Sequence, residues 1–299
     1  MSLRLQLPVE TLSQQIRAAC ILECTAPKPG NVFPGRNFTD VTDCDFRRSA
    51  DAIAPILADA ASLGVGRAIR DAVVATRQAV GSNTNLGMIL LLAPLAAVPP
   101  HFPCSDGIEK VLDGIDIPQT ALIFEAIRLA QPGGLGKADS NDVATTPDAP
   151  IIDVMALAPH DRIAWQYTHR FDDVLGWGRH RFLNALQHGL SWSDALVRVH
   201  VEFIARQSDS LILRKLGERL AAEAQHRASK LLSLWDEKSP PPSEIREFDA
   251  WLREDGNRRN PGTTADLLAA MLFALIRDGL WHPPEEISIS PNPAMPASF

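Results

Sequence analysis

The chain has 299 residues, of which 45% are hydrophobic and 22% are charged, a composition typical of a globular protein. Its formal net charge of −7 argues against bulk nucleic-acid binding, and its longest apolar run, 88–98, is too short to cross a bilayer. The cysteines lack the paired spacing of a zinc site, so we expect free thiols and a cytoplasmic protein (Cys20, Cys24, Cys44 and Cys104).

The N-terminal part of the chain predicts three helices. Apolar residues recur at the helical period over 9–24, over the segment that begins at Thr42, and over 66–80. Asp45 lies three residues after Thr42, which is the spacing of a capping box, so we expect it to be a structural carboxylate. Pro55 should kink or split the second helix.

A stiff turn, Pro27-Lys28-Pro29-Gly30-Asn31-Val32, separates the first two helices, and Asp40 and Asp43 follow it. Proline and glycine restrict the backbone there, so Lys28 should be held in place. A fixed cation followed by carboxylates suits a phosphate and a divalent metal. The alternative is an ordinary surface turn. Glu23, at the end of the preceding helix, is either a site carboxylate or an exposed charge.

A polar break at 81–85 leads into 86–97, a helix that is apolar on every side. Such a helix is usually surrounded by other helices, so we expect it at the centre of the protein. The small polar residues before it would aim backbone N–H groups and the positive end of the helix dipole at an anion. The alternative is simple N-capping by Ser82 or Thr84.

A Gly-rich loop, 131–142, follows a helix predicted over 119–130. It is not a P-loop, because its first glycine is misplaced, alanine replaces the required Ser/Thr, and no strand precedes it. The loop nevertheless carries Lys137, Asp139 and Asp142. Long loops in compact helical proteins are more often functional or disordered than idle.

The C-terminal half predicts six more helices before a last loop: 151–158, 161–176, 178–190, 192–206, 211–235 and 243–254. The last loop, 255–264, brings Arg258 and two threonines to the start of an apolar helix, 265–278, which Gly279 should close. A basic residue and a Pro-Gly turn ahead of a helix again describe an anion cradle.

No period-two alternation is long enough to build a sheet. We therefore expect an all-α protein, a single-domain multi-helix bundle over residues 1–281 with a buried central helix pair, followed by an extended Pro-rich tail, 282–299. If the polar loops share one end of the bundle, Lys and Arg would serve phosphates and Asp would serve Mg²⁺. That favours phosphate-ester or phosphoribosyl chemistry.

Five motifs, in this order along the chain, resemble those of the triphosphoribosyl-dephospho-CoA synthase family: Pro27-Lys28-Pro29-Gly30, the Asp40 region, Asn83-Thr84-Asn85-Leu86-Gly87, 209–217, and Asn260 to Ala269. The segments 133–143 and 161–167 are similar to members found outside citrate-lyase pathways. Asn85 and Phe38-Thr39 stand where the family usually has histidines. The resemblance is thus to a divergent member.

The resemblance implies an all-helical enzyme that uses ATP as a ribosyl donor, releases adenine, and joins the triphosphoribosyl group to the ribose 2′-hydroxyl of dephospho-CoA. Carried over by position, it implies phosphate contacts from Lys28 and Arg214, metal contacts from Asp40 and Asp43, and nucleotide contacts from Asn83, Thr84, Asn85, Thr263 and Asp266. From the loops themselves we add Lys137 and Arg258 for phosphate, Gly30, Asn31 and Gly262 for the nucleotide, Asp142 for the metal, and Asp40 or Asp139 as the base.

The expected partners are ATP, Mg²⁺ and a CoA-like acceptor, with no nucleic acid and no membrane, and a homodimer is left open. Two alternatives remain at this point. One is a phosphotransferase or phosphohydrolase that acts on a nucleotide or pterin-type cofactor precursor at the same site. The other is a helical binding protein without enzymatic activity.

Overall fold

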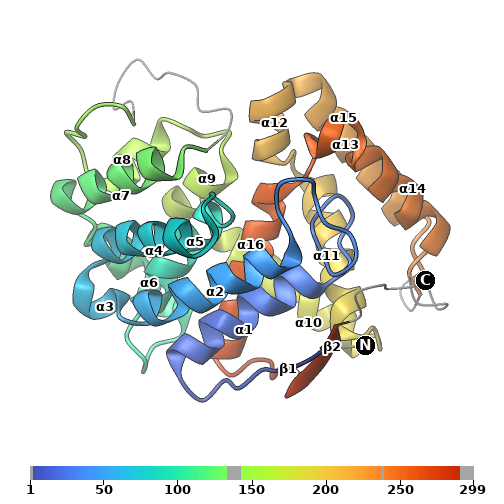
Figure 1. Ribbon diagram of the computed structural model, residues 1–299, viewed down its shortest axis with the longest axis horizontal. Coiled ribbons are helices and arrows are strands. Elements are labelled where there is room, and N and C mark those ends of the chain that lie inside the picture. The colour runs from blue at the N-terminus through green and yellow to red at the C-terminus, as the bar shows by residue number, and fades with distance from the viewer. Residues whose placement is uncertain (1–2, 133–142, 237–238, 290–299) are drawn as a thin grey trace.

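The computed structural model describes residues 3–132, 143–236 and 239–289 and confirms the all-α prediction (Figure 1). The first half contains α1 (Leu12–Thr25), α2 (Asp43–Ala58), α3 (Ala60–Leu63), α4 (Val65–Val80), α5 (Leu86–Ala96), α6 (Cys104–Asp113), α7 (Ile117–Ala130), α8 (Ile151–Ala156) and α9 (Arg162–Thr168). The second half contains the π-helix η1 (Asp172–Gly178), α10 (Arg179–Gln187), α11 (Trp192–Arg206), α12 (Ser210–Leu216), α13 (Glu218–Ser233), α14 (Pro242–Leu252), α15 (Glu254–Asn257) and α16 (Gly262–Arg277).

The buried helix pair expected from the sequence is α5 and α16. α5 is buried from Gly87 to Ala96, and α16 is buried over most of its length. The two helices pack against each other, and α16 also packs against α1 and α11. This follows from their composition, because a helix that is apolar on every side leaves no face for water.

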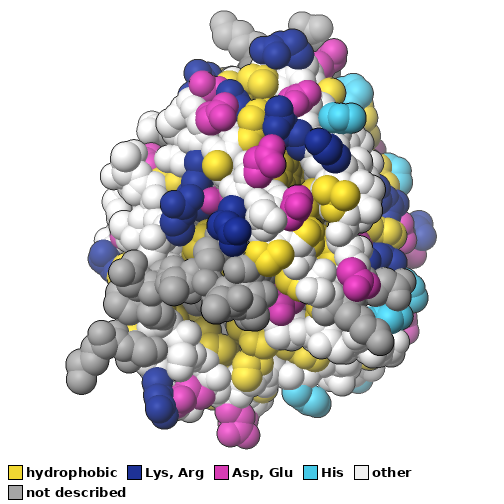
Figure 2. Space-filling view, turned by 90° about the vertical axis from the view of Figure 1, so that its right-hand side faces the viewer, with side chains coloured by type: hydrophobic (Ala, Val, Ile, Leu, Met, Phe, Trp, Pro, Cys, Tyr) yellow, Lys and Arg dark blue, Asp and Glu magenta, His cyan; other side chains and the backbone are white. Residues whose placement is uncertain are grey.

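The remaining helices form two groups on either side of α16 (Figure 1). One group, α3 to α9, shares the main apolar core with α1 and α2. The other is built by α11 to α14, and a second apolar cluster that includes Ala224, Leu231 and Phe248 holds it together. On the face shown in Figure 2, acidic and basic side chains are interspersed. No helix within the described ranges is long and apolar enough to cross a membrane.

Helix starts follow the local signals in the sequence. Thr11 and Gln14 form a capping box at the start of α1, and Thr42 and Asp45 form one at the start of α2, so Asp45 is a structural carboxylate. Of the two effects predicted for Pro55, a kink or a split, the split is wrong, because α2 continues through this residue to Ala58.

Some element boundaries differ from the predictions, and positive φ angles account for two of them. The helix predicted over 161–176 stops at Thr168, because Arg170 and Phe171 have φ angles of 53° and 61°, and η1 follows. The helix predicted over 211–235 is divided at Gly217, where φ is 81°. Helix α6 was not predicted.

A small sheet joins the two ends of the described chain. β1 (Leu3–Gln6) pairs antiparallel with β2 (Glu286–Ile289), with Leu3 opposite Ile289. The segment expected to be an extended tail therefore includes a strand. Each strand has four residues, too few for a reliable alternation pattern in the sequence.

Candidate active site

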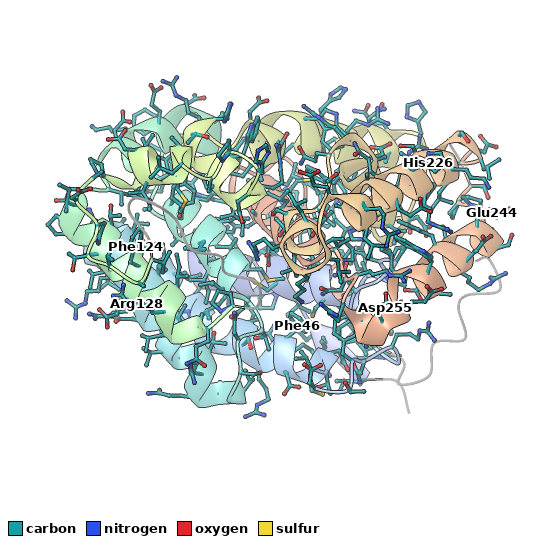
Figure 3. The ribbon with its side chains drawn as sticks, turned by 90° about the horizontal axis from the view of Figure 1, so that it is seen from above. Phe46, Phe124, Arg128, His226, Glu244 and Asp255 are labelled. Carbon is teal, nitrogen blue, oxygen red and sulfur yellow. The ribbon has the colours of Figure 1, made fainter. Side chains whose placement is uncertain are left out.

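A cavity of about 820 Å³ lies between the two helix groups, at the N-terminal ends of α5 and α16. Its floor is the end of α1, and its walls come from the loop 31–41, from α7 to α9, from α12 and from the segment 256–260. In Figure 3, Phe124 on α7 and Phe46 on α2 mark two sides of this cavity. Its size is in the usual range for small-molecule sites.

The cavity brings together most of the described residues that the sequence predicts for the site. These are Asn31, Asp40, Asn83, Thr84, Asn85, Arg214, Arg258, Gly262, Thr263 and Asp266. They come from four segments that are far apart in the sequence, 31–40, 83–85, the region of Arg214, and 258–266. The expectation that the polar loops meet at one end of the bundle is thus matched for this set.

The polar residues before α5 are held by hydrogen bonds rather than pointing freely into the cavity. The Asn83 carboxamide oxygen accepts from the N–H of Leu86, the first residue of α5, at 3.1 Å. The Asn85 carboxamide oxygen accepts from the hydroxyl of Thr76, and the Thr84 hydroxyl bonds to Ser49. The predicted capping by Ser82 or Thr84 is therefore wrong: the N-cap residue of α5 is Asn85, and its side chain makes no capping hydrogen bond.

Asp209 fixes α12 against α16. One of its carboxylate oxygens accepts from the N–H groups of Leu211 and Ile212 at 2.9 and 3.1 Å, which caps α12. The other oxygen accepts from the N–H and the hydroxyl of Thr264 at 2.7 and 2.8 Å. Because Asp209 is buried and uses both oxygens, α12 holds a defined position relative to the cavity.

Three cations line the cavity next to this anchor. Arg214 pairs with Asp161, with 2.5 Å between Nη1 and Oδ2, and Arg258 donates to the carbonyl of Lys215 at 3.2 Å. Burial and the positive charge of Arg214 lower the pKa of Lys215. Positive charge concentrated on one wall suits a polyphosphate. Lys215 lies in the 209–217 motif but is not among the residues that the sequence predicts for phosphate.

Lys28 is not among the lining residues. Its side chain is fully buried, its Nζ lies 3.0 Å from Oε1 of Glu23, and it also donates to the carbonyls of Glu23 and Ala26. A phosphate in the cavity therefore does not meet this ammonium group directly. The cation predicted to bind phosphate instead holds a carboxylate that lines the cavity.

Distant residues direct Lys28 inward. The N–H of Gly30 donates to Asp249 at 2.8 Å, and the imidazole Nε2 of His200 bonds to the carbonyl of Pro29 at 3.0 Å. Gly30 has a φ of 77°, and a Cβ there would lie 2.8 Å from Leu252 and from Pro261. The turn is stiff, as predicted. Gly30 itself packs behind the cavity and does not line it.

The predicted metal ligands are not gathered in one place. Asp40 is exposed and lines the cavity. Asp43 does not line it, since it is buried and pairs with Arg47 at 2.8 Å. Lys137, Asp139 and Asp142 lie outside the described residues. Within the ranges that the structure describes, no three acidic, His or Cys side chains cluster as a metal site.

Two carboxyl groups form the innermost polar part of the lining. Glu23 is buried at the end of α1, and burial raises its pKa while Lys28 opposes the rise. Asp266, on α16, has its pKa raised well above the usual range by burial and then by the charges of Glu23 and Asp209. The sequence placed Asp266 among nucleotide contacts and left Glu23 undecided.

Another part of the lining is largely apolar. It is formed by side chains of α5, α7, α8 and α9 and of the segment that joins the last two: Leu90, Phe124, Ile127, Val154, Met155, Leu157, Ala158 and Ile163. The cavity therefore has one charged wall and one apolar wall. The sequence gave no local signal for the apolar wall, because each of these side chains fits an ordinary core position.

The family model described as CitG, ATP:dephospho-CoA triphosphoribosyl transferase, matches residues 9–283. A crystal structure from Archaeoglobus fulgidus, provisionally described as a triphosphoribosyl-dephospho-CoA synthase, is similar with a TM-score of 0.61 and 23% identity. That match covers 77% of this chain and 98% of the other, and at this identity it shows a shared fold. No curated protein matches the chain. Because the family model spans nearly the whole chain, this protein belongs to the CitG family of ATP:dephospho-CoA triphosphoribosyl transferases.

Proposed function

We propose that this protein transfers the triphosphoribosyl group of ATP to a hydroxyl of dephospho-CoA, with release of adenine and with assistance from Mg²⁺. The observation that carries the proposal is the cavity itself, whose lining combines cations, apolar side chains and two carboxyl groups, the buried Glu23 and the half-buried Asp266. Polyphosphate, purine and acceptor each find a matching surface there.

The triphosphate is placed against Arg214, Lys215 and Arg258. Arginine and lysine form strong, charge-assisted hydrogen bonds with phosphate oxygens. Asp161 holds Arg214 in the free enzyme, so the guanidinium is already oriented before the nucleotide arrives. Pre-oriented groups lose less side-chain entropy on binding.

The apolar wall is placed against the adenine ring and the pantetheine arm of the acceptor. Phe124 and Met155 offer flat and adaptable apolar surfaces to such groups. The cavity volume of about 820 Å³ lies within the range of sites that enclose most of a drug-sized ligand.

Mg²⁺ fits this cavity as a partner of the triphosphate. Protein sites for Mg²⁺ commonly use one or two carboxylates together with substrate phosphates, and Asp40 is the exposed carboxylate of the lining that suits this role. When bound, the ion would neutralise phosphate charge. The protein's own contribution is to present Asp40 near the side of the cavity that Lys215 occupies, since the two groups interact electrostatically.

The test is to incubate the protein with ATP, Mg²⁺ and dephospho-CoA and to identify the products by mass spectrometry. Free adenine and an acceptor heavier by a triphosphoribosyl group are the expected products. ADP or inorganic phosphate without adenine would instead support the phosphotransferase or phosphohydrolase alternative. A run with Arg214→Ala should lose activity, and a run with Arg219→Ala, an exposed arginine outside the lining, should not.

A further inference from the structure

We propose that Glu23 and Asp266 are the acid–base pair of the transfer, with Lys28 as the positioning residue that keeps Glu23 ionised. In this assignment Glu23 takes the proton of the acceptor hydroxyl, and Asp266 gives a proton to the departing adenine. The assignment rests on the proposed function. It differs from the choice of Asp40 or Asp139 as the base that the sequence suggested.

The fold places both carboxyl groups in the same small space. Glu23 is near the end of α1, Asp266 is in the first turns of α16, and these helices pack against each other. Both side chains line the cavity, and they are close enough for the charge of Glu23 to raise the pKa of Asp266. Two carboxyl groups on one cavity are the arrangement that glycosyl-transfer chemistry uses elsewhere.

Lys28 favours the ionised form of Glu23, against the burial that raises the pKa of this carboxyl group. The two side chains are 0% and 3% exposed, and 3.0 Å separates Nζ from Oε1. Two further titratable groups lie near Lys28. His200 stays neutral, because burial and the charge of Lys28 lower its pKa to about 3. Burial and the charge of Glu23 raise the pKa of the Cys24 thiol, and Lys28 opposes the rise. The positive charge of Lys28 is therefore balanced by Glu23, which suits a group that must accept a proton.

The surroundings of Asp266 favour its protonated form. It faces the carboxylates of Glu23 from α1 and Asp209 from the start of α12, while Arg214 and the N–H of Met88 favour ionisation. Burial is the largest influence and acts against the charge. The thiol of Cys20, also on α1, lies near both carboxyl groups, and burial holds its pKa above the usual range. Environments that separate two carboxyl groups in this way mark an acid and a base.

Gly87 lets Asp266 reach the cavity beside α5. A Cβ on Gly87 would lie 1.9 Å from Oδ2 of Asp266 and 2.4 Å from its Cγ. Only a residue without a side chain allows the carboxyl group this close to the first turn of α5. The close approach explains why a glycine directly follows Leu86 in an otherwise apolar helix.

The proposed step balances in atoms and charge. The bond between C1′ of ATP and N9 of adenine breaks, its electron pair stays on the base, and the base receives the proton of Asp266. The acceptor oxygen forms the new bond to C1′ and gives its proton to Glu23. One proton passing from Glu23 to Asp266 restores the starting state. The ribosyl cation character that develops between these events is stabilised by the negative charge of Glu23.

The test compares Glu23→Gln and Asp266→Asn with Asp194→Asn, a carboxamide substitution on α11 outside the lining. We expect kcat to fall by about 10²–10⁴-fold in both site variants. The affinity for ATP, measured by calorimetry, should stay within about threefold, and Asp194→Asn should match the wild type. If Glu23→Gln does not fold, the double variant Glu23→Gln, Lys28→Met, which removes the buried pair as a whole, takes its place.

A second substrate separates the two roles. An ATP analogue methylated at N7 carries a positively charged base that leaves without gaining a proton. With this analogue, Asp266→Asn should regain most of the kcat that it loses with ATP, whereas Glu23→Gln should not. Asp266→Asn also should lose the basic limb of the pH profile.

The outcomes distinguish this inference from the proposed function. If the wild type releases no adenine from ATP, the proposed function fails. If the wild type is active and either site variant keeps kcat within about fivefold, the acid–base assignment is overturned and the function stands. If Asp266→Asn lowers kcat equally with ATP and with the methylated analogue, the role of Asp266 as the acid is overturned.

Discussion

Replacing Lys28 with methionine tests the buried ion pair beneath the cavity. Methionine keeps a similar length but removes the charge, so the carboxylate of Glu23 is left in the interior without its partner. Both side chains are shielded from water, at 0% and 3% exposure, and solvent screening does not reduce the effect. Breaking such a pair by removing one partner costs about 3–5 kcal/mol. We expect Lys28→Met to lower the free energy of unfolding by this amount at pH 7.

The loss of unfolding free energy in Lys28→Met should depend on pH in a defined direction. Without Lys28, the pKa of Glu23 in the folded state rises further above its unfolded value, because burial then acts without compensation. A carboxyl group with a raised folded pKa binds more protons in the folded state, so the stability of the variant falls as pH rises between the two values. The deficit against the wild type should therefore be smaller at pH 5 than at pH 7.

Urea unfolding followed by circular dichroism measures these differences. The double variant Glu23→Gln, Lys28→Met should recover most of the lost stability, because it buries no unpaired charge. A cycle with both single variants then gives the coupling energy of the pair. A deficit under about 1 kcal/mol at pH 7, or single effects that simply add in the double variant, would refute the argument that Lys28 serves Glu23.

Three further variants probe the cavity. Arg214→Ala should raise the KM for ATP at least about tenfold, because one hydrogen bond to a charged group is worth about 1.5–3 kcal/mol, and an unchanged KM relative to Arg219→Ala would contradict the phosphate role. Gly87→Ala should destabilise the fold by about 1–3 kcal/mol, since its Cβ would overlap Asp266, whereas Gly114→Ala, with its nearest contacts at 3.4 Å, should cost less in thermal unfolding. Asp40→Asn should raise the Mg²⁺ concentration for half-maximal activity about tenfold, equivalent to about 1.4 kcal/mol, without altering stability, and an unchanged Mg²⁺ titration would count against Asp40.

The central helices and the capping box of α2 could be predicted because their causes are local. The apolar sequence of α5 and the Thr42–Asp45 spacing each act within a few residues of the chain. Helix α6 shows the limit of this approach, since it follows a Pro-rich connector and buries only part of its surface. Local patterns therefore predict the helices better than their exact ends.

The orientation of the Lys28 side chain could not be predicted, because residues far along the chain determine it. Asp249 and His200 hold the turn through the backbone of Gly30 and Pro29, from positions 219 and 171 residues away. A cation on a stiff turn can face the cavity or the core with the same local sequence. The same reasoning applies to Asp43, whose pairing with Arg47 removes it from the cavity.

The first turns of α12 and α16 each give two hydrogen bonds to Asp209, and the N–H of Met88 on α5 faces Asp266. N–H groups at the starts of α16 and α5, the two helices predicted to face an anion, therefore face carboxyl groups, and the positive charge for a polyphosphate comes from side chains. Binding of the nucleotide should therefore affect the pKa of Asp266, the proposed acid. The charge of Arg214 lowers the pKa of Asp266 in the free enzyme, and a bound phosphate would compensate that charge.

The pKa of Asp266 should consequently rise when ATP binds, which would favour the protonated acid in the complex. The pH dependence of kcat/KM reports groups in the free enzyme, and that of kcat reports groups in the complex with substrate. We expect the basic limb of kcat to lie at a higher pH than that of kcat/KM for ATP, and Arg214→Ala should narrow the gap. A basic limb at the same pH in both profiles would show that the charged wall and the acid act independently.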